Sequence, residues 1–446
     1  MPGQNSNRWW EILRILSKYG FPTLLLSRKY SQHKGGSATK SFVGQKLRQA
    51  MEELGPTFIK LGQFLSTRPD LIGTEIASQL TGLQEQVEPM TMTQVREQIT
   101  RSLGQPPEVL FPYFDYSPAA SASIGQVHLA VLTTGERVAV KVQRPNIEAI
   151  IHKDLQIIER LLPLIRKPLA LDQMFDVEDV LSSFRRTLDK ELDFRQEGQN
   201  IENFREALSD IPAIIIPRLF WRYTTREILT MEWLEGNSVT EFAASVSRQV
   251  RTNLAESLML GLLLPCFRTG LFHGDLHPGN VRFFPDGRLA LLDFGITGYI
   301  SNEFRQQSGE LLTALWRGNV DKVVDLALTM GRPTGRINEH HFYEDMAVLV
   351  NRIKGLGLEA NTFGDILLGM VHMSLSHGLK MPPPFFLLGK ALALAESLAK
   401  ELDPGFNILS LADVVSRMIL QEKVELATRE DNITGRLMDW QQLFMG

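Results

Sequence analysis

Residues 271–296 constrain this chain more than any other segment, because they gather acidic and amide side chains around short apolar stretches. The segment reads LFHGDLHPGNVRFFPDGRLALLDFGI, which predicts a loop, a strand, a turn at residues 285–287 and a second strand. Asp275, Asn280 and Asp293 lie at the ends of these predicted elements. Their hard oxygen atoms are the ligands that Mg²⁺ prefers, so the segment predicts a metal-assisted reaction.

The spacing of these residues is typical of a phosphoryl-transfer loop. HGDLHPGN at residues 273–280 fits the H-x-D-x-x-x-x-N pattern of protein kinases, and residues 293–295 supply the metal-binding D-F-G. In that chemistry Asp275 is the base or orients the attacking nucleophile. Asn280 and Asp293 hold Mg²⁺.

A second interpretation takes the same segment as a transition-metal site of a hydrolase. Its ligands would be His273, Asp275, His277 and Asp293. This interpretation gives no role to Asn280, and His277 is better explained as shaping the loop backbone.

Phosphoryl transfer also needs a cation for the nucleotide phosphates, and Lys141 fits that role. It closes the strand-like run VAVK at residues 138–141, after a predicted hairpin turn at 133–136. A lysine in this position needs a carboxylate partner. The acidic run 191–197, within a helix predicted over 177–208, provides candidates.

The loop before this strand lacks the glycine-rich pattern of ordinary protein kinases. Glycine is usual there because side-chain methyl groups limit how closely a backbone approaches phosphates. We therefore expect this loop to hold a triphosphate in a different way. The predicted nucleotide-contacting residues are Ala119, Ala120, Ser121, Ala122 and Ser123.

The order of predicted elements indicates a bilobal protein-kinase-like fold of the α+β class. Residues 1–110 are predicted to be a helical extension, residues 111–235 a strand-containing N-lobe and residues 236–446 a helical C-lobe. A strand over 227–231 leads into a linker whose Glu232 and Leu234 are expected to contact the nucleotide. After D-F-G the chain carries no A-P-E and only a short span before the next helix, which disfavours a peptide-docking segment.

Composition excludes several classes of function. A net charge of −4 and a pI near 6.2 argue against nucleic acid as a partner. We find no signal peptide and no apolar run long enough for a membrane span, so we expect a cytoplasmic protein, at most peripheral to the membrane. The amphipathic helix predicted over 8–18, with Trp9 and Trp10, suits either a membrane interface or packing on the protein itself.

Together the motifs resemble those of the UbiB/AarF family of atypical kinases. They are KLGQ at 60–63, PAASASIGQVH at 118–128, VAVK, the run ELDFRQE at 191–197, HGDLHPGN and DFG. HGDLHPGN alone also suits aminoglycoside- or choline-kinase-like phosphotransferases, and the KxGQ, alanine-rich and ExD motifs separate this chain from them. One alanine of the commonest alanine-rich pattern is Ser121 here.

The resemblance implies roles for further residues. Glu197 is expected to pair with Lys141. Glu191 and Asp193 are expected to form the ExD pair that meets Lys60, with Lys60 and Gln63 on helices folded over the cleft and gating it.

The resemblance also implies a Mg²⁺-dependent ATPase or small-molecule kinase that binds ATP or ADP. We expect it to support isoprenoid-quinone or other prenyl-lipid metabolism at a membrane surface, with a prenyl-lipid or quinone-precursor ligand and lipid-biosynthesis enzymes as partners. The alternatives are a nucleotide-sensing scaffold without turnover and a small-molecule phosphotransferase of the aminoglycoside- or choline-kinase type.

Overall fold

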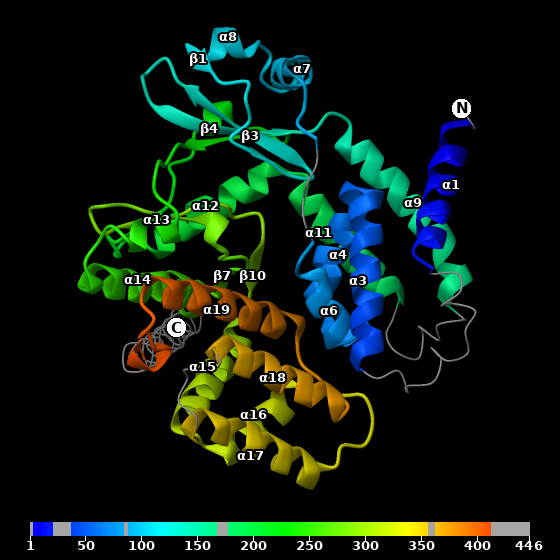
Figure 1. The fold of residues 1–446 in the computed structure, drawn as a ribbon, viewed down its shortest axis with the longest axis vertical. Helices are drawn as coiled ribbons and strands as arrows, with labels where there is room; N and C mark the ends of the chain where they lie inside the picture. The colour runs from blue at the N-terminus through cyan, green and yellow to red at the C-terminus, as the bar shows by residue number, and fades with distance from the viewer. Residues whose placement is uncertain (1–2, 21–36, 84–87, 167–176, 356–361, 412–446) are drawn as a thin grey trace, which may run out of the picture. The chain divides into compact units, whose positions relative to one another are not determined.

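The chain folds into two compact units, which we describe separately. The computed structural model describes residues 3–20, 37–83, 88–166, 177–355 and 362–411. Unit 1 consists of residues 1–202 and 217–233, and unit 2 of residues 203–216 and 234–446. Unit 1 combines helices with an antiparallel sheet and unit 2 is mainly helical, which confirms the predicted α+β class (Figure 1).

A 5-stranded antiparallel sheet forms one part of unit 1, with the order β1-β3-β4-β6 and β2 paired to β3. In β4, the side chains of Val138, Val140 and Val142 are fully buried on one face, beneath α7. Since side chains alternate across a strand, Ala139 and Lys141 lie on the opposite face. The strands are β1 (Tyr113–Phe114), β2 (Ala120–Ser121), β3 (Gly125–Val131), β4 (Arg137–Gln143) and β6 (Ile228–Glu232).

The remaining helices of unit 1 pack around their own apolar core. Ile12 and Ile15 of α1 are buried against Met51, Leu54 and other apolar side chains, whereas Trp10 remains 66% exposed. The apolar face of the N-terminal helix therefore packs on the protein itself. The helices are α1 (Gly3–Lys18), α3 (Ser37–Leu54), α4 (Pro56–Ser66), α5 (Pro69–Ile72), α6 (Thr74–Leu80), α7 (Met92–Leu103), α8 (Pro107–Leu110), α9 (Ile147–Arg166), α11 (Val177–Glu191) and α12 (Phe194–Ala207).

The helix predicted over residues 177–208 is interrupted, and the structure corrects that prediction. Helix α11 ends at Glu191 and α12 begins at Phe194. At the junction, the Asp193 carbonyl accepts from the Gln196 N–H, and its side chain accepts from the Arg195 N–H. Asp193 thus satisfies amides at the start of a new helix, which a helical periodicity across the run does not reveal.

Unit 2 is built around α14, whose middle is buried on all sides. Leu258, Leu262 and Leu264 have no exposed surface, and α14 packs against α19, which in turn packs against α18. The helices are α13 (Val239–Ala243), α14 (Arg248–Thr269), α15 (Asn302–Arg317), α16 (Val320–Met330), α17 (Glu339–Gly355), α18 (Phe363–Ser376) and α19 (Pro383–Leu402).

Short strands of unit 2 position residues 271–296, which carry Asp275, Asn280 and Asp293. β8 and β9 form the predicted hairpin, and β5 pairs parallel to β9. β7 pairs with β10, and β11 with β12. The strands are β5 (Ile214–Ile215), β7 (Leu271–His273), β8 (Val281–Phe283), β9 (Leu289–Leu291), β10 (Thr297–Tyr299), β11 (Arg332–Pro333) and β12 (Leu379–Lys380).

Within the described residues, no helix has both the length and the apolar content that crossing a bilayer requires.

Candidate active site

The backbone around Asp275 is fixed by two neighbouring side chains. Its N–H donates to Nδ1 of His273 at 3.2 Å, and its carbonyl oxygen accepts from the Asn280 amide nitrogen at 3.0 Å. His273 is fully buried, and burial lowers its pKa, so the imidazole is neutral and Nδ1 accepts the hydrogen bond. The hydrogen bond between the Asn280 side chain and the Asp275 backbone therefore fixes the position of Asn280 relative to Asp275.

Two backbone hydrogen bonds join this loop to the D-F-G segment. The Leu292 N–H donates to the Asn280 carbonyl at 3.0 Å, and the Gly274 N–H donates to the Ile296 carbonyl at 2.9 Å. A Cβ atom on Gly274 would lie 2.9 Å from the Ile296 side chain, so this contact requires glycine. Asp293 follows Leu292 directly and so belongs to the same framework as Asn280.

Asp293 and Phe294 are anchored in different ways. Oδ1 of Asp293 accepts from the Gly295 N–H at 2.8 Å, which orients the carboxylate. Phe294 is fully buried, with its ring centroid 5.1 Å from that of Phe204 and 5.3 Å from that of His273. The apolar anchor keeps the D-F-G backbone against the catalytic loop.

The donor chemistry here fits Mg²⁺. Because the Asn280 amide nitrogen is used in a hydrogen bond, its amide oxygen is the atom offered to a ligand, and Asp293 contributes a carboxylate. Both are the hard oxygen donors that Mg²⁺ prefers. His273 and His277 instead accept hydrogen bonds from backbone amides, as expected of residues that shape a loop. In the part of the chain that the structure describes, no three His, Cys, Asp or Glu side chains gather to hold a metal ion.

One residue at this site was missed by the sequence analysis. Nζ of Lys390, on α19, lies 3.4 Å from Oδ1 of Asp275. On the other side of the carboxylate, Nε2 of His277 lies 3.8 Å from Oδ2. The sequence marks Lys390 only as a single lysine inside the apolar run 382–395, and that pattern does not indicate a contact with Asp275.

Lys141 pairs with Glu197 in unit 1. Its Nζ lies 2.9 and 2.8 Å from the two carboxylate oxygens of Glu197, which is 6% exposed. The ammonium also lies 5.1 Å from the ring centroid of Phe194 at the start of α12. The β4 register and the first turn of α12 thus place a lysine and a glutamate together on the face of the sheet opposite Val138, Val140 and Val142.

The alanine-rich loop is held by Arg144. This guanidinium donates to the Ala122 carbonyl at 3.1 Å and to Oγ of Ser121 at 3.0 Å. Ser121, the departure from the commonest pattern, thus fastens the loop at β2. Ser123 is fully buried, whereas Ala119 and Ala120 are exposed, so residues of the loop differ in their access to a ligand.

The residues with predicted gating roles lie on α4 and at the α11–α12 junction. Nζ of Lys60 lies 2.8 Å from Oε2 of Glu191, and the two side chains are 12% and 14% exposed. Asp193 receives both side-chain hydrogen bonds of Arg195, at 2.8 and 2.6 Å. These bonds to Arg195 hold the pKa of Asp193 below its usual range. Gln63 lies one turn after Lys60 and is partly buried.

Glu232 and Leu234 lie on either side of the boundary between the two units, which falls after Trp233. Glu232 exchanges two hydrogen bonds with Arg218, through its own N–H and its Oε2.

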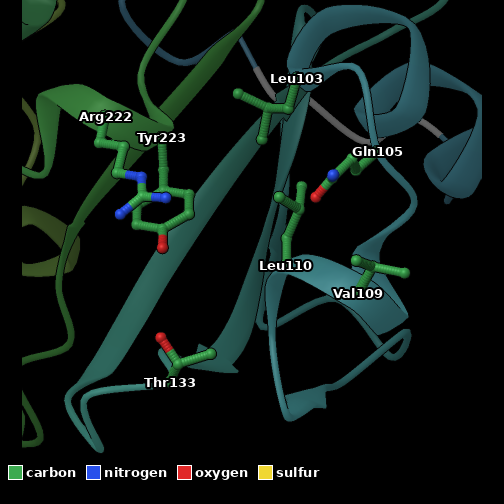
Figure 2. A pocket seen from close by; sticks show the side chains of 7 residues that line it. All are labelled: Leu103, Gln105, Val109, Leu110, Thr133, Arg222 and Tyr223. Carbon is green, nitrogen blue, oxygen red and sulfur yellow. The ribbon is translucent and has the colours of Figure 1, made fainter.

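Unit 1 also contains a pocket, lined by Leu103, Leu110 and Tyr223 among others (Figure 2). Of the predicted site residues that the structure describes, none lines it.

The fold and the site define an atypical kinase-like protein, and the comparison with family models agrees. The ABC1 atypical kinase-like domain matches residues 82–327, and the UbiB helical domain matches residues 346–407. Because the first match covers more than half of the chain, this chain belongs to the ABC1 atypical kinase-like family. The resemblance stated from the motifs is confirmed.

Named relatives support this assignment. The probable protein kinase UbiB of Marinobacter nauticus is 32% identical over 404 residues, covering 89% of this chain and 74% of that protein. The protein of the same name from Azotobacter vinelandii is 30% identical over 434 residues, covering 96% and 79%. A Mycobacterium tuberculosis protein solved in complex with erythromycin aligns with a TM-score of 0.54 and 25% identity, covering 79% of this chain and 94% of that one.

Proposed function

We propose that this protein is a Mg²⁺-dependent ATP-binding atypical kinase or ATPase. The observation that carries the proposal is the single hydrogen-bonded framework that holds Asp275, Asn280 and Asp293 in unit 2. Unit 1 adds a lysine, Lys141, held by the carboxylate of Glu197. A lysine, two oxygen-donor metal ligands and an aspartate base are the parts that phosphoryl transfer requires.

In this mechanism each residue has a separate task. Lys141 binds the nucleotide phosphates, Asn280 and Asp293 would hold Mg²⁺, and Asp275 receives a proton. Mg²⁺ held there would supply positive charge beside the phosphate oxygens. The attacking hydroxyl oxygen bonds to the γ-phosphorus as the bond to the β–γ bridging oxygen breaks. ADP leaves with that electron pair, and the hydroxyl proton passes to Asp275 and then to solvent.

A small acceptor fits this site better than a peptide. Only a short strand, β10, lies between D-F-G and α15, which begins at Asn302 with Ser301 as its N-cap. The segment that docks peptides in protein kinases thus has little room here. We propose water or a phenolic prenyl-lipid precursor as the acceptor, in line with the family resemblance. Release of inorganic phosphate without any added acceptor would support water, stimulation by such a precursor or by vesicles would support the precursor, and phosphate transfer to a peptide in place of both would contradict the choice.

Asp275→Asn tests turnover. We expect ATP hydrolysis to fall about a hundredfold while ATP affinity is retained, because the amide cannot accept the proton but keeps the size of the side chain. Steady-state phosphate release and calorimetric titration measure the two quantities. Unchanged hydrolysis would contradict the base role. If the wild-type protein binds ATP but neither hydrolyses it nor transfers its phosphate to a precursor, the nucleotide-sensing scaffold is the correct function.

We also propose that the pair Lys60–Glu191 restrains α4 against α11 and limits turnover. Lys60→Met should lower the free energy of unfolding by about 1–3 kcal/mol, because it leaves a mostly buried carboxylate unpaired. It should also raise basal ATP hydrolysis. Arg195→Met is the matched control, since Arg195 is 56% exposed and also pairs with a carboxylate. If the Lys60→Met variant hydrolyses ATP at the wild-type rate, the Lys60–Glu191 pair does not limit turnover.

A further inference from the structure

Helix α19 brings a cation to the catalytic loop from a part of the chain far from it in sequence. α19 lies in the segment that matches the UbiB helical domain, whereas the loop lies in the kinase-like domain. Leu387 of α19 faces Gly274, since a Cβ atom on that glycine would lie 3.3 Å from Cδ1 of Leu387. Lys390 is one turn further along the helix on the same face, beside Asp275.

A lysine at this place is not required by the packing of α19. Leu388, Ala391 and Leu392 around it are buried, and Lys390 itself is 22% exposed. A partly buried ion pair contributes little net stability, because the cost of removing both charges from water offsets their attraction. An apolar residue would serve the helix equally well, so the charge calls for another explanation.

The catalytic segment offers no other permanent cation for a phosphate. Among residues 271–296 the described cations are Arg282 and Arg288. Arg282 donates to the carbonyl oxygens of Gly279 and Val281, and Arg288 pairs with Asp286 at the hairpin turn. Both guanidiniums therefore serve the loop itself, and Lys390 is the cation that faces Asp275.

We propose that Lys390 binds the terminal phosphate of ATP, with Asp275 orienting its ammonium. This inference rests on the proposed function and deepens it. The terminal phosphoryl group must lie next to Asp275 when the acceptor attacks, which places it beside Lys390. A cation there stabilises charge on the transferring phosphoryl oxygens, and the flexible lysine stem allows the ammonium to shift from the carboxylate to the phosphate. The helical domain thus contributes a binding residue and does more than support the fold.

The proposal predicts a selective loss of affinity for the triphosphate. Lys390→Met should weaken ATP binding about tenfold or more, because a charge-assisted hydrogen bond to the terminal phosphate is lost. ADP affinity should be nearly unchanged, since ADP lacks that phosphate. Lys390→Arg, which retains the charge, should keep most of the preference for ATP. Titration calorimetry of the full chain with Mg²⁺ and each nucleotide measures these affinities.

The matched control is Lys400→Met on the same helix. Lys400 also pairs with a carboxylate, because its Nζ lies 3.5 Å from Oε1 of Glu396. The Lys400→Met substitution should leave the ratio of ATP affinity to ADP affinity unchanged. If the wild-type protein binds both nucleotides and Lys390→Met does not change that ratio, this inference is overturned and the proposed function stands. If the wild-type protein binds neither nucleotide, both are overturned.

Discussion

Replacement of Asp293 by asparagine should abolish the Mg²⁺-dependent part of ATP binding and lower ATP turnover about a thousandfold or more. The metal contributes several kcal/mol of charge stabilisation to phosphoryl transfer, and each 1.4 kcal/mol corresponds to about a factor of ten. Asparagine keeps an oxygen that accepts from the Gly295 N–H, so the local turn is preserved. The loss would therefore report on the missing charge and not on a disordered loop.

Asp286→Asn provides the control for this variant. Asp286 lies at the turn of the same hairpin, is 50% exposed and pairs with Arg288. Asp286→Asn makes the same chemical change as Asp293→Asn, and this variant should bind Mg²⁺ and ATP as the wild-type protein does. Titration of ATP with and without Mg²⁺ measures the effect. An Asp293→Asn protein that keeps the Mg²⁺ dependence of the wild type would contradict the assignment of Asp293 as a metal ligand.

Lys141→Met should reduce ATP turnover and ATP affinity together, with a loss in kcat/KM of about a thousandfold. Loss of one preorganised donor to developing charge costs about 10²–10³ in rate, and weaker binding adds to it. The variant should also destabilise the protein, because the carboxylate of Glu197, only 6% exposed, loses its cation. A loss of activity alone would thus not separate catalysis from folding.

A second substitution separates the two effects. The double variant Lys141→Met/Glu197→Gln removes the negative charge that Glu197 would carry without its lysine partner. The free energy of unfolding should therefore return most of the way to the wild-type value. ATP binding should not recover, since the cation remains absent. Chemical denaturation and nucleotide titration of both variants test this. Recovery of ATP binding in the double variant would show that Lys141 acts only by neutralising Glu197.

The hairpin within residues 271–296 could be predicted from the sequence because its signals are local, whereas the catalytic roles of its residues stay predictions. Asp275, Asn280 and Asp293 lie within one short stretch, and the turn at residues 285–287 determines the β8–β9 hairpin. The pairing of Lys141 with Glu197 came from the family resemblance, since a β-strand and a helix separated by more than fifty residues carry no local signal of contact.

The predictions that depended on distant or subtle context were less complete. The run IIIPRL at residues 214–219 predicts a strand, whereas β5 covers only Ile214–Ile215 and pairs with β9 in unit 2. In the sequence Lys390 is only a single charge inside the apolar run 382–395. Its proposed role depends on the packing of α19 against the loop that carries Asp275, and helical periodicity alone does not show which helix lies there. The sequence pattern also predicts a helix over residues 408–428, most of which lie outside the described residues.

The proposed roles of Lys141 and Asp293 are most directly tested by the number of ATP molecules bound per chain. The proposed mechanism gives each of these residues its own role in binding ATP. Calorimetric titration with Mg²⁺ should show one ATP per wild-type chain. Lys141→Met/Glu197→Gln and Asp293→Asn should each lose that binding event while remaining folded. Wild-type ATP affinity in either variant would contradict the proposed role of the substituted residue.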